Sequence, residues 1–392
     1  NMHSSDDSVY VHSLNVSLIC RQIGKWIKAD DATLDMLTLA GLLHDIGNPP
    51  FGHFGEVVIG DWFKSHLDRL SYKGRPLSQW LDRQMKADLC HFEGNAQALR
   101  LLTKVYRVDS AFGMDLMPAV LNTLVKYPVD STRVDKASAD VKLHKLGYYK
   151  AEEALFGALA SATGTRTVEG FCRHPLTYIL EAADDIAYAT ADLEDAYKKG
   201  LFTLDEFGRF FRDTLEAKKD DWGLNGGQVK KSAEMIDELT RLRERESSSM
   251  AAFQRWIAYA RHWLMYTAAF GFVPYGAGQT DSYSAIMEGT FRREIMEGTF
   301  HGGSIRILKA AMGRFAYDSE GILTLELAAQ TILTTLLSRF VPAVLYLDAG
   351  DDAPEEYRPT AAEKKLVKLL SENQLACYRA DAEGKDEGYR LY

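Results

Sequence analysis

Histidines and carboxylates are concentrated between residues 44 and 56. His44 and Asp45 stand side by side after an apolar run, and His53 and Glu56 follow a Gly-Asn-Pro-Pro turn. Imidazole and carboxylate groups together are a common donor set for a divalent metal ion, and a histidine polarised by a carboxylate can act as a general acid or base. This segment therefore offers residues for both metal binding and proton transfer.

The His44-Asp45 pair can bind one ion only in a particular backbone setting. Adjacent side chains on a helix point about 100° apart, so both reach one ion only where the helix ends. Gly47 and Pro49 provide such an end, because proline cannot continue the hydrogen-bond ladder. A histidine that only caps a helix is the commoner explanation of an isolated His-Asp pair, but the residues that follow favour a metal site.

His53 and Glu56 are predicted to be a catalytic pair. Residues at i and i+3 are neighbours on one helix face. A carboxylate that bonds one ring nitrogen fixes the tautomer of a histidine and raises its basicity. The alternative is a surface His–Glu pair of little consequence. The turn through Pro49 and Pro50 keeps the pair close to His44, which favours the catalytic interpretation.

A second group of acids lies in the alanine-rich segment 181–195. Asp184, Tyr188 and Asp192 are spaced at i, i+4 and i+8, so on a regular helix they share one face within about 80°. We expect Asp184 to be a metal ligand and Tyr188 and Asp192 to line the same cavity. The alternative is a solvated acidic face. His12 is a further candidate ligand, although spacing alone does not distinguish it from His91 or His174.

The elements that must position these residues are predicted to be helices. Apolar residues recur at helical spacing over long segments, only 10 prolines occur in 392 residues, and no long alternating strand pattern is present. We predict an all-α fold, with room for a short hairpin, in which residues 1–200 form the catalytic core and residues 201–392 pack on it within one domain. Helices are expected at residues 12–28, 31–45, 53–64, 91–102, 116–126, 150–162, 175–198, 204–217, 227–247, 250–270, 305–316, 322–340 and 360–373. The polar residues 69–90, 129–145 and 348–359 are expected to be largely loops.

Composition narrows the functional classes. The net charge of −9 argues against a dedicated nucleic-acid-binding protein. Because the protein is acidic, an anionic substrate would need a locally positive pocket. Four widely separated cysteines indicate a reduced, cytoplasmic chain. No apolar run reaches the roughly 18 residues of a membrane span, and the first residues are not a signal peptide. They also do not resemble a native start, so we expect native sequence upstream.

These residues resemble a known family. His12, His44-Asp45 and Asp184 resemble the H…HD…D signature of the HD superfamily of metal-dependent phosphohydrolases. More narrowly, several segments resemble the deoxyguanosine triphosphate triphosphohydrolase family: HDIGNPPFGHFGE (44–56), HFEGNAQALRLL (91–102), VKYP (125–128), KLGYYKAEEALF (145–156) and RHPLTYILEAADDIAYATADLEDA (173–196).

The resemblance implies a helical fold and hydrolysis of a deoxynucleoside triphosphate, dGTP above all, to a deoxynucleoside and tripolyphosphate. It assigns the metal ligands, the catalytic pair and the substrate-binding residues as follows: His12, His44, Asp45 and Asp184; His53 and Glu56; Tyr188, Asp192, Lys126, Lys145 and Asn95. The ion would be Mn²⁺ or Mg²⁺, while Fe, Co, Ni or Zn would also suit the ligands. A homo-oligomer such as a hexamer, and a nucleotide or single-stranded DNA effector, are further expectations.

One position departs from the family pattern. An arginine usually stands three residues before the first histidine, and here that position is Val9. Either a phosphate contact is missing, or, as we expect, the true upstream segment is absent from this chain. Two other functions are kept open: an HD-type nucleotide phosphatase or phosphodiesterase, and a non-catalytic nucleotide-sensing or DNA-binding scaffold. The long match over residues 173–196 argues against the first, and the intact set of metal and catalytic residues argues against the second.

Overall fold

The structure is a computed structural model that describes residues 6–106, 113–273, 282–317, 320–347 and 354–392. Within these ranges the predicted all-α fold is confirmed, because the only strands belong to two antiparallel hairpins of two-residue strands. They are β1 (Ser71–Tyr72) with β2 (Arg75–Pro76), and β3 (Arg166–Thr167) with β4 (Gly170–Phe171).

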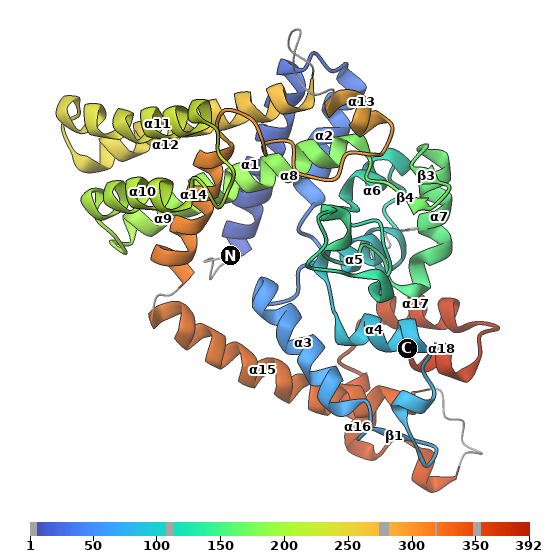
Figure 1. The fold of residues 1–392 in the computed structure, drawn as a ribbon. Coiled ribbons are helices and arrows are strands. Elements are labelled where there is room, and N and C mark those ends of the chain that lie inside the picture. Colours follow the sequence, from blue (N-terminus) through green and yellow to red (C-terminus); the bar gives the residue numbers. More distant parts are fainter. Residues whose placement is uncertain (1–5, 107–112, 274–281, 318–319, 348–353) are drawn as a thin grey trace.

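The central helices are α1 (Asp6–Trp26), α2 (Asp31–Leu43), α8 (Pro175–Ala187) and α12 (Ser249–Phe272). Helix α1 packs against the other three, and the four lie together across the upper middle of Figure 1. Apolar residues at helical spacing on α1, including Val16, Ile19 and Ile23, are at most 5% exposed and belong to the main hydrophobic core. This core holds the helices that carry His12, His44 and Asp184.

The remaining helices surround this centre (Figure 1). On one side lie α9 (Leu193–Lys198), α10 (Leu204–Lys218), α11 (Gly226–Arg245) and α14 (Gly302–Met312). Helix α13 (Ser282–Met287) lies at the upper right of Figure 1 and contacts α12. On the other lie α3 (Gly52–His66), α4 (Arg83–Cys90), α5 (Gly94–Arg100), α6 (Pro118–Leu124), α7 (Glu153–Ala162), α15 (Glu320–Leu345), α16 (Ala361–Val367), α17 (Glu372–Ala382) and α18 (Glu387–Leu391). Short 3₁₀ turns occur at Leu77–Gln79, Ser131–Arg133, Val141–Leu143, Lys150–Glu152 and Glu355–Tyr357.

Several helices differ from the sequence-based expectation. The helix predicted over 175–198 is interrupted, because Tyr188–Asp192 forms a π-helical turn between α8 and α9. Residues 69–90 contain α4, which begins where the Asp82 side chain accepts a hydrogen bond from the Met85 N–H. Within the predicted acidic loop 348–359, residues 348–353 lie outside the described residues. The helix expected over 360–373 instead comprises α16 and the start of α17.

The turn after α2 is held against the start of α5. A Cβ atom placed on Gly47 would lie 2.0 Å from the Gly94 carbonyl oxygen and 2.2 Å from the Ala98 nitrogen. Only glycine permits this approach of two backbones. The turn that follows His44 is therefore fixed by a helix that begins nearly fifty residues later.

Helix α15 is apolar and largely uncovered. Within Gly321–Leu345, an 18-residue part with a mean hydropathy of 1.4 has 11% of its residues buried, so by length and composition alone this helix could cross a membrane. Glu326 and Arg339 interrupt this stretch. The expectation from the sequence that no apolar run reaches the length of a membrane span did not identify this helix. Its exposed apolar side chains are Leu323, Leu325, Leu327, Ile332 and Leu336. All four cysteines are free.

Candidate metal centre and proton-transfer pair

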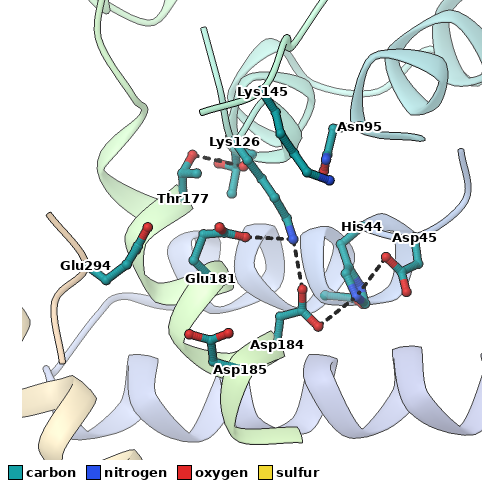
Figure 2. Close-up of polar contacts among 12 residues, drawn as sticks. His44, Asp45, Asn95, Lys126, Lys145, Thr177, Glu181, Asp184, Asp185 and Glu294 are labelled. Carbon is teal, nitrogen blue, oxygen red and sulfur yellow. Dashed lines mark hydrogen bonds and ion pairs between the residues drawn. The ribbon is translucent and has the colours of Figure 1, made fainter. Parts of the chain in front are cut away.

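The predicted metal ligands come together from three helices. His12 lies on α1. His44 and Asp45 follow the end of α2, and Asp184 lies on α8 (Figure 2). Donor atoms of His12, His44 and Asp184 all lie within 4.8 Å of one another. Asp45 lies beside these three residues: its Oδ1 is 3.4 Å from His44 Nε2, and its Oδ2 is 3.9 Å from His12 Nε2.

His44 is oriented for metal binding by the backbone. Its Nδ1–H donates to the Gly41 carbonyl at 2.9 Å, which leaves the Nε2 lone pair directed at the cluster. Nε2 is buried and has no hydrogen-bond partner among the described residues. A buried nitrogen left unsatisfied costs free energy, whereas a metal ion would satisfy it. The donor set of two imidazoles and two carboxylates fits a divalent ion.

The alternatives to His12 are excluded by their positions. His174 caps α8, where its ring nitrogen accepts from the Leu176 N–H, and burial lowers its pKa to about 4. His91 bonds the Ala87 carbonyl at the exposed end of α4. By contrast His12 is 5% exposed, and its Nε2 lies 3.2 Å from Asp184 Oδ1. Tertiary packing therefore identifies His12 as the candidate ligand, which the sequence spacing could not do.

Lys126 balances the charge of the cluster. Its Nζ lies 2.8 Å from Asp184 Oδ2 and 2.6 Å from Glu181 Oε1 (Figure 2). Burial alone would raise the pKa of Asp184, but the charge of Lys126 above all, together with the hydrogen bond to His12, holds this pKa well below its usual value. Asp184 therefore stays ionised at neutral pH, as a ligand must.

The sequence did not reveal how Lys126 is held. Arg173, 2% exposed, donates from Nε to the Lys126 carbonyl at 2.6 Å, and its Nη1 lies 3.0 Å from Glu294 Oε1. Arg173 and Glu181 both lie in the segment 173–196 that carries the family resemblance, but neither was singled out. Because Glu294 lies more than a hundred residues away, no local spacing could have revealed this network.

The predicted pair of His53 and Glu56 is formed on the first turn of α3. His53 Nδ1–H donates to Glu56 Oε2 at 2.8 Å, and Glu56 Oε1 accepts from the Gly94 N–H at 2.7 Å. The His53 side chain is 73% exposed, while that of Glu56 is 8% exposed. Burial alone would raise the pKa of Glu56, but the His53 hydrogen bond and the charge of Lys145 hold it below its usual value. His53 is thus anchored on one nitrogen and open on the other.

Lys145 and Asn95 meet at a residue that was not predicted, Glu93. Lys145 Nζ lies 3.0 Å from Glu93 Oε1, and Asn95 Nδ2 donates to the same oxygen at 2.6 Å. Lys145 Nζ is also 3.9 Å from Glu56 Oε2. Lys145 and Asn95 therefore lie beside the His53–Glu56 pair. Glu93 stands within the segment HFEGNAQ, which was recognised without a role for its glutamate.

Tyr188 and Asp192 lie at the two ends of the π-helical turn. Tyr188 is partly buried and packs against the main core, whereas Asp192 is 1% exposed. A π turn is wider than an α turn, so the i, i+4, i+8 geometry predicted for a regular helix does not hold here. Such turns often occur at functional sites. The substrate-binding role of both residues stays a prediction.

The chain is similar to several known proteins. Residues 9–104 match the HD domain family. A deoxyguanosinetriphosphate triphosphohydrolase-like protein of Listeria innocua is 38% identical over 97% of this chain and 80% of the relative. A probable deoxyguanosinetriphosphate triphosphohydrolase of Pseudomonas aeruginosa is 33% identical over 95% and 75%, and a deoxyguanosinetriphosphate triphosphohydrolase of Serratia proteamaculans is 30% identical over 95% and 78%.

The HD match covers the part of the chain that carries His12, His44 and Asp45 together with His53 and Glu56. The relatives extend the likeness over nearly all of the remaining residues. The chain is therefore a hydrolase and belongs to the family of HD-domain deoxyguanosinetriphosphate triphosphohydrolase-like proteins.

Proposed function

We propose that the chain hydrolyses deoxynucleoside triphosphates, with dGTP as the favoured substrate, to a deoxynucleoside and inorganic tripolyphosphate in a metal-dependent reaction. The observation that carries the proposal is the buried Nε2 of His44, unsatisfied and surrounded by His12, Asp45 and Asp184. The names of the relatives supply the substrate class.

His12, His44, Asp45 and Asp184 would hold a divalent ion, with Mn²⁺ or Mg²⁺ favoured and Fe, Co, Ni or Zn also compatible. A bound ion would act as a Lewis acid toward an α-phosphate oxygen and lower the pKa of water. The four protein ligands leave coordination positions for phosphate and water.

Lys126 and Lys145 supply the positive charge that a triphosphate requires in an acidic protein. Each ammonium group lies against carboxylates, Glu181 and Asp184 for Lys126 and Glu93 for Lys145. A phosphate oxygen can replace or join these partners, because an ammonium group donates three hydrogen bonds. The two lysines would thus bind the triphosphate.

His53 handles the proton. The Glu56 carboxylate accepts from His53 Nδ1–H, so Nε2 is the nitrogen that can exchange a proton with substrate or water. When water attacks the α-phosphorus, the bond to the 5′ oxygen breaks and that oxygen needs a proton. His53 either protonates this leaving oxygen or accepts the proton of the water. Asn95 would bind the substrate close to the His53–Glu56 pair.

Tyr188 and Asp192 are proposed to contact the deoxyribose. A tyrosine packed under the 2′ carbon would leave no space for a ribose hydroxyl, and this exclusion would select deoxynucleotides.

Incubation with each dNTP and with GTP, in Mn²⁺ or Mg²⁺, followed by separation of the products, tests the proposal. We expect tripolyphosphate and deoxynucleoside from dNTPs and far less turnover of GTP. Orthophosphate released stepwise would support the alternative phosphatase, and absence of turnover would support the non-catalytic scaffold. A chelator is expected to abolish the activity.

We also propose a homo-oligomer, such as a hexamer, working in the cytoplasm. Helix α15 supports assembly, because its leucines and Ile332 are exposed on a largely uncovered helix, and exposed apolar patches often mark protein–protein contacts. The four free cysteines support a reducing compartment. Size-exclusion chromatography with light scattering tests assembly, and activity assays with added nucleotide or single-stranded DNA test for an effector.

A further inference from the structure

Three residues of the proposed proton-transfer region meet at one dipeptide, Glu93-Gly94. The Glu93 Oε1 atom accepts from Lys145 Nζ at 3.0 Å and from Asn95 Nδ2 at 2.6 Å. The next residue along, Gly94, donates its N–H to Glu56 Oε1 at 2.7 Å. One short segment therefore contacts the lysine, the amide and the carboxylate that orients His53.

The backbone of this dipeptide is fixed from two sides. The Tyr149 hydroxyl accepts from the Glu93 N–H and donates to the Glu93 carbonyl, each at 3.1 Å. A Cβ atom on Gly94 would lie 2.4 Å from Asn48 Oδ1 and 2.9 Å from Glu56 Oε1, so a larger residue would displace one or both of these side chains. The Glu93 side chain consequently starts from a rigid point.

The Glu93 carboxylate is in a costly position. The residue is 6% exposed, and the charge of Glu56 lies nearby. Burial of a carboxylate is unfavourable unless a cation and hydrogen-bond donors compensate it. Burial raises the pKa of Glu93, and the charge of Lys145 opposes that rise. A neutral glutamine at position 93 would accept the Asn95 hydrogen bond equally well. The negative charge of Glu93 therefore matters for its contact with Lys145.

We propose that Glu93 is a positioning residue that holds the Lys145 ammonium group in place for the substrate's triphosphate and away from Glu56. The proposal rests on the nucleotide hydrolysis proposed above. Without the charge of Glu93, Lys145 would turn to Glu56 Oε2, which is already only 3.9 Å from Nζ. Lys145 would then be displaced from its position for phosphate binding.

Steady-state kinetics of Glu93→Gln with dGTP test this role. We expect KM to rise about 10- to 100-fold with a smaller change in kcat, because a displacement of about 1 Å can cost 100-fold and lost ground-state binding appears in KM. A defect of folding alone would lower the active fraction, and hence kcat, without raising KM. Glu152→Gln is the matched control, since Glu152 is also fully buried and pairs with Lys104. It is expected to lower the melting temperature and leave KM unchanged.

A double-mutant cycle tests whether Glu93 acts through Lys145. If it does, Glu93→Gln combined with Lys145→Met has the same KM as Lys145→Met alone. The inference would be overturned if the KM increases of the two single variants multiply in the double variant, or if KM is unchanged in Glu93→Gln. In either case an active wild-type enzyme would still support the proposed function. An inactive wild type would overturn the function instead. If Glu93→Gln does not fold, Glu93→Asp replaces it, because this variant keeps the charge and shortens the side chain. We expect KM to rise in Glu93→Asp as well, but by a smaller factor. An unchanged KM in Glu93→Asp would contradict the inference.

Discussion

The metal cluster and the His53–Glu56 pair are built in opposite ways. The cluster takes its candidate metal ligands from α1, from the end of α2 and from α8, and its His44 side chain is fully buried. The pair comes from one turn of α3, and its His53 side chain is 73% exposed. A backbone carbonyl orients His44, whereas the carboxylate of a neighbouring residue orients His53. The metal cluster therefore depends on tertiary packing, while the pair depends on local geometry and access.

This contrast predicts the largest loss at the cluster. Asp184→Asn removes a charged ligand with little change in shape and leaves Lys126 without one carboxylate. We expect kcat to fall by more than about 1000-fold, since a Lewis-acid contribution of several kcal/mol is lost. Metal analysis of the purified variant should show loss of the bound ion. Retained metal with retained activity would contradict the assignment of this cluster.

The exposed pair is expected to be separable from the metal. His53→Ala should lower kcat by about 100- to 10,000-fold, the usual contribution of a general acid or base, while metal content stays at the wild-type level. Full activity would remove His53 from the mechanism. Loss of metal in this variant would show that the two regions are not independent.

Metal binding should stabilise the folded protein only when the metal cluster is intact. At a metal concentration of a hundred times Kd, binding contributes about 2.7 kcal/mol to the free energy of unfolding. Thermal unfolding with and without Mn²⁺ should show a higher Tm with metal for the wild type and for His53→Ala. Asp184→Asn should show no such increase, and an equal increase in all three proteins would place the ion elsewhere.

Glu56 is expected to have a smaller effect than His53, because it acts through that residue. Glu56→Gln should lower kcat by about 10- to 100-fold, as found for outer partners that orient a histidine. The double variant with His53→Ala should be no slower than His53→Ala alone. An additional loss in the double variant would indicate that Glu56 contacts substrate directly.

The smallest effect concerns the pH dependence of stability. The pKa of Glu56 lies below its usual value of 4.5 in the folded protein, so its ionised form stabilises the fold above that pH and the contribution is lost as pH falls through the folded pKa. The Tm difference between wild type and Glu56→Gln should therefore be constant from about pH 5.5 to 8 and shrink below about pH 4.5. A difference that shrinks already above pH 6 would show that the pKa is raised instead.

The same contrast explains what could be predicted from the sequence. The His53–Glu56 contact follows from a three-residue spacing on one helix, and the helical fold follows from apolar periodicity. His12 could not be chosen over His91 or His174 by spacing, because only the packing of α1 against α8 brings it to Asp184. The π-helical turn after α8 could not be predicted from the sequence, because its residues are equally compatible with a regular α-helix.

The supporting residues were the hardest to predict. Glu93 reaches Lys145 across a sequence separation of 52 residues, and Arg173 reaches Glu294 across 121. Burial of such charges is tolerated only when distant segments supply the partner, so neither residue has a local signature. The family resemblance marked both segments without giving their glutamate and arginine a role.

Hydrolysis of dGTP in water labelled with oxygen-18 tests the central claim most directly. If the chain cleaves between the α-phosphorus and the 5′ oxygen, mass spectrometry will find one labelled oxygen in tripolyphosphate and none in deoxyguanosine, with equal amounts of the two products. Labelled orthophosphate or pyrophosphate, or label in the nucleoside, would contradict the account.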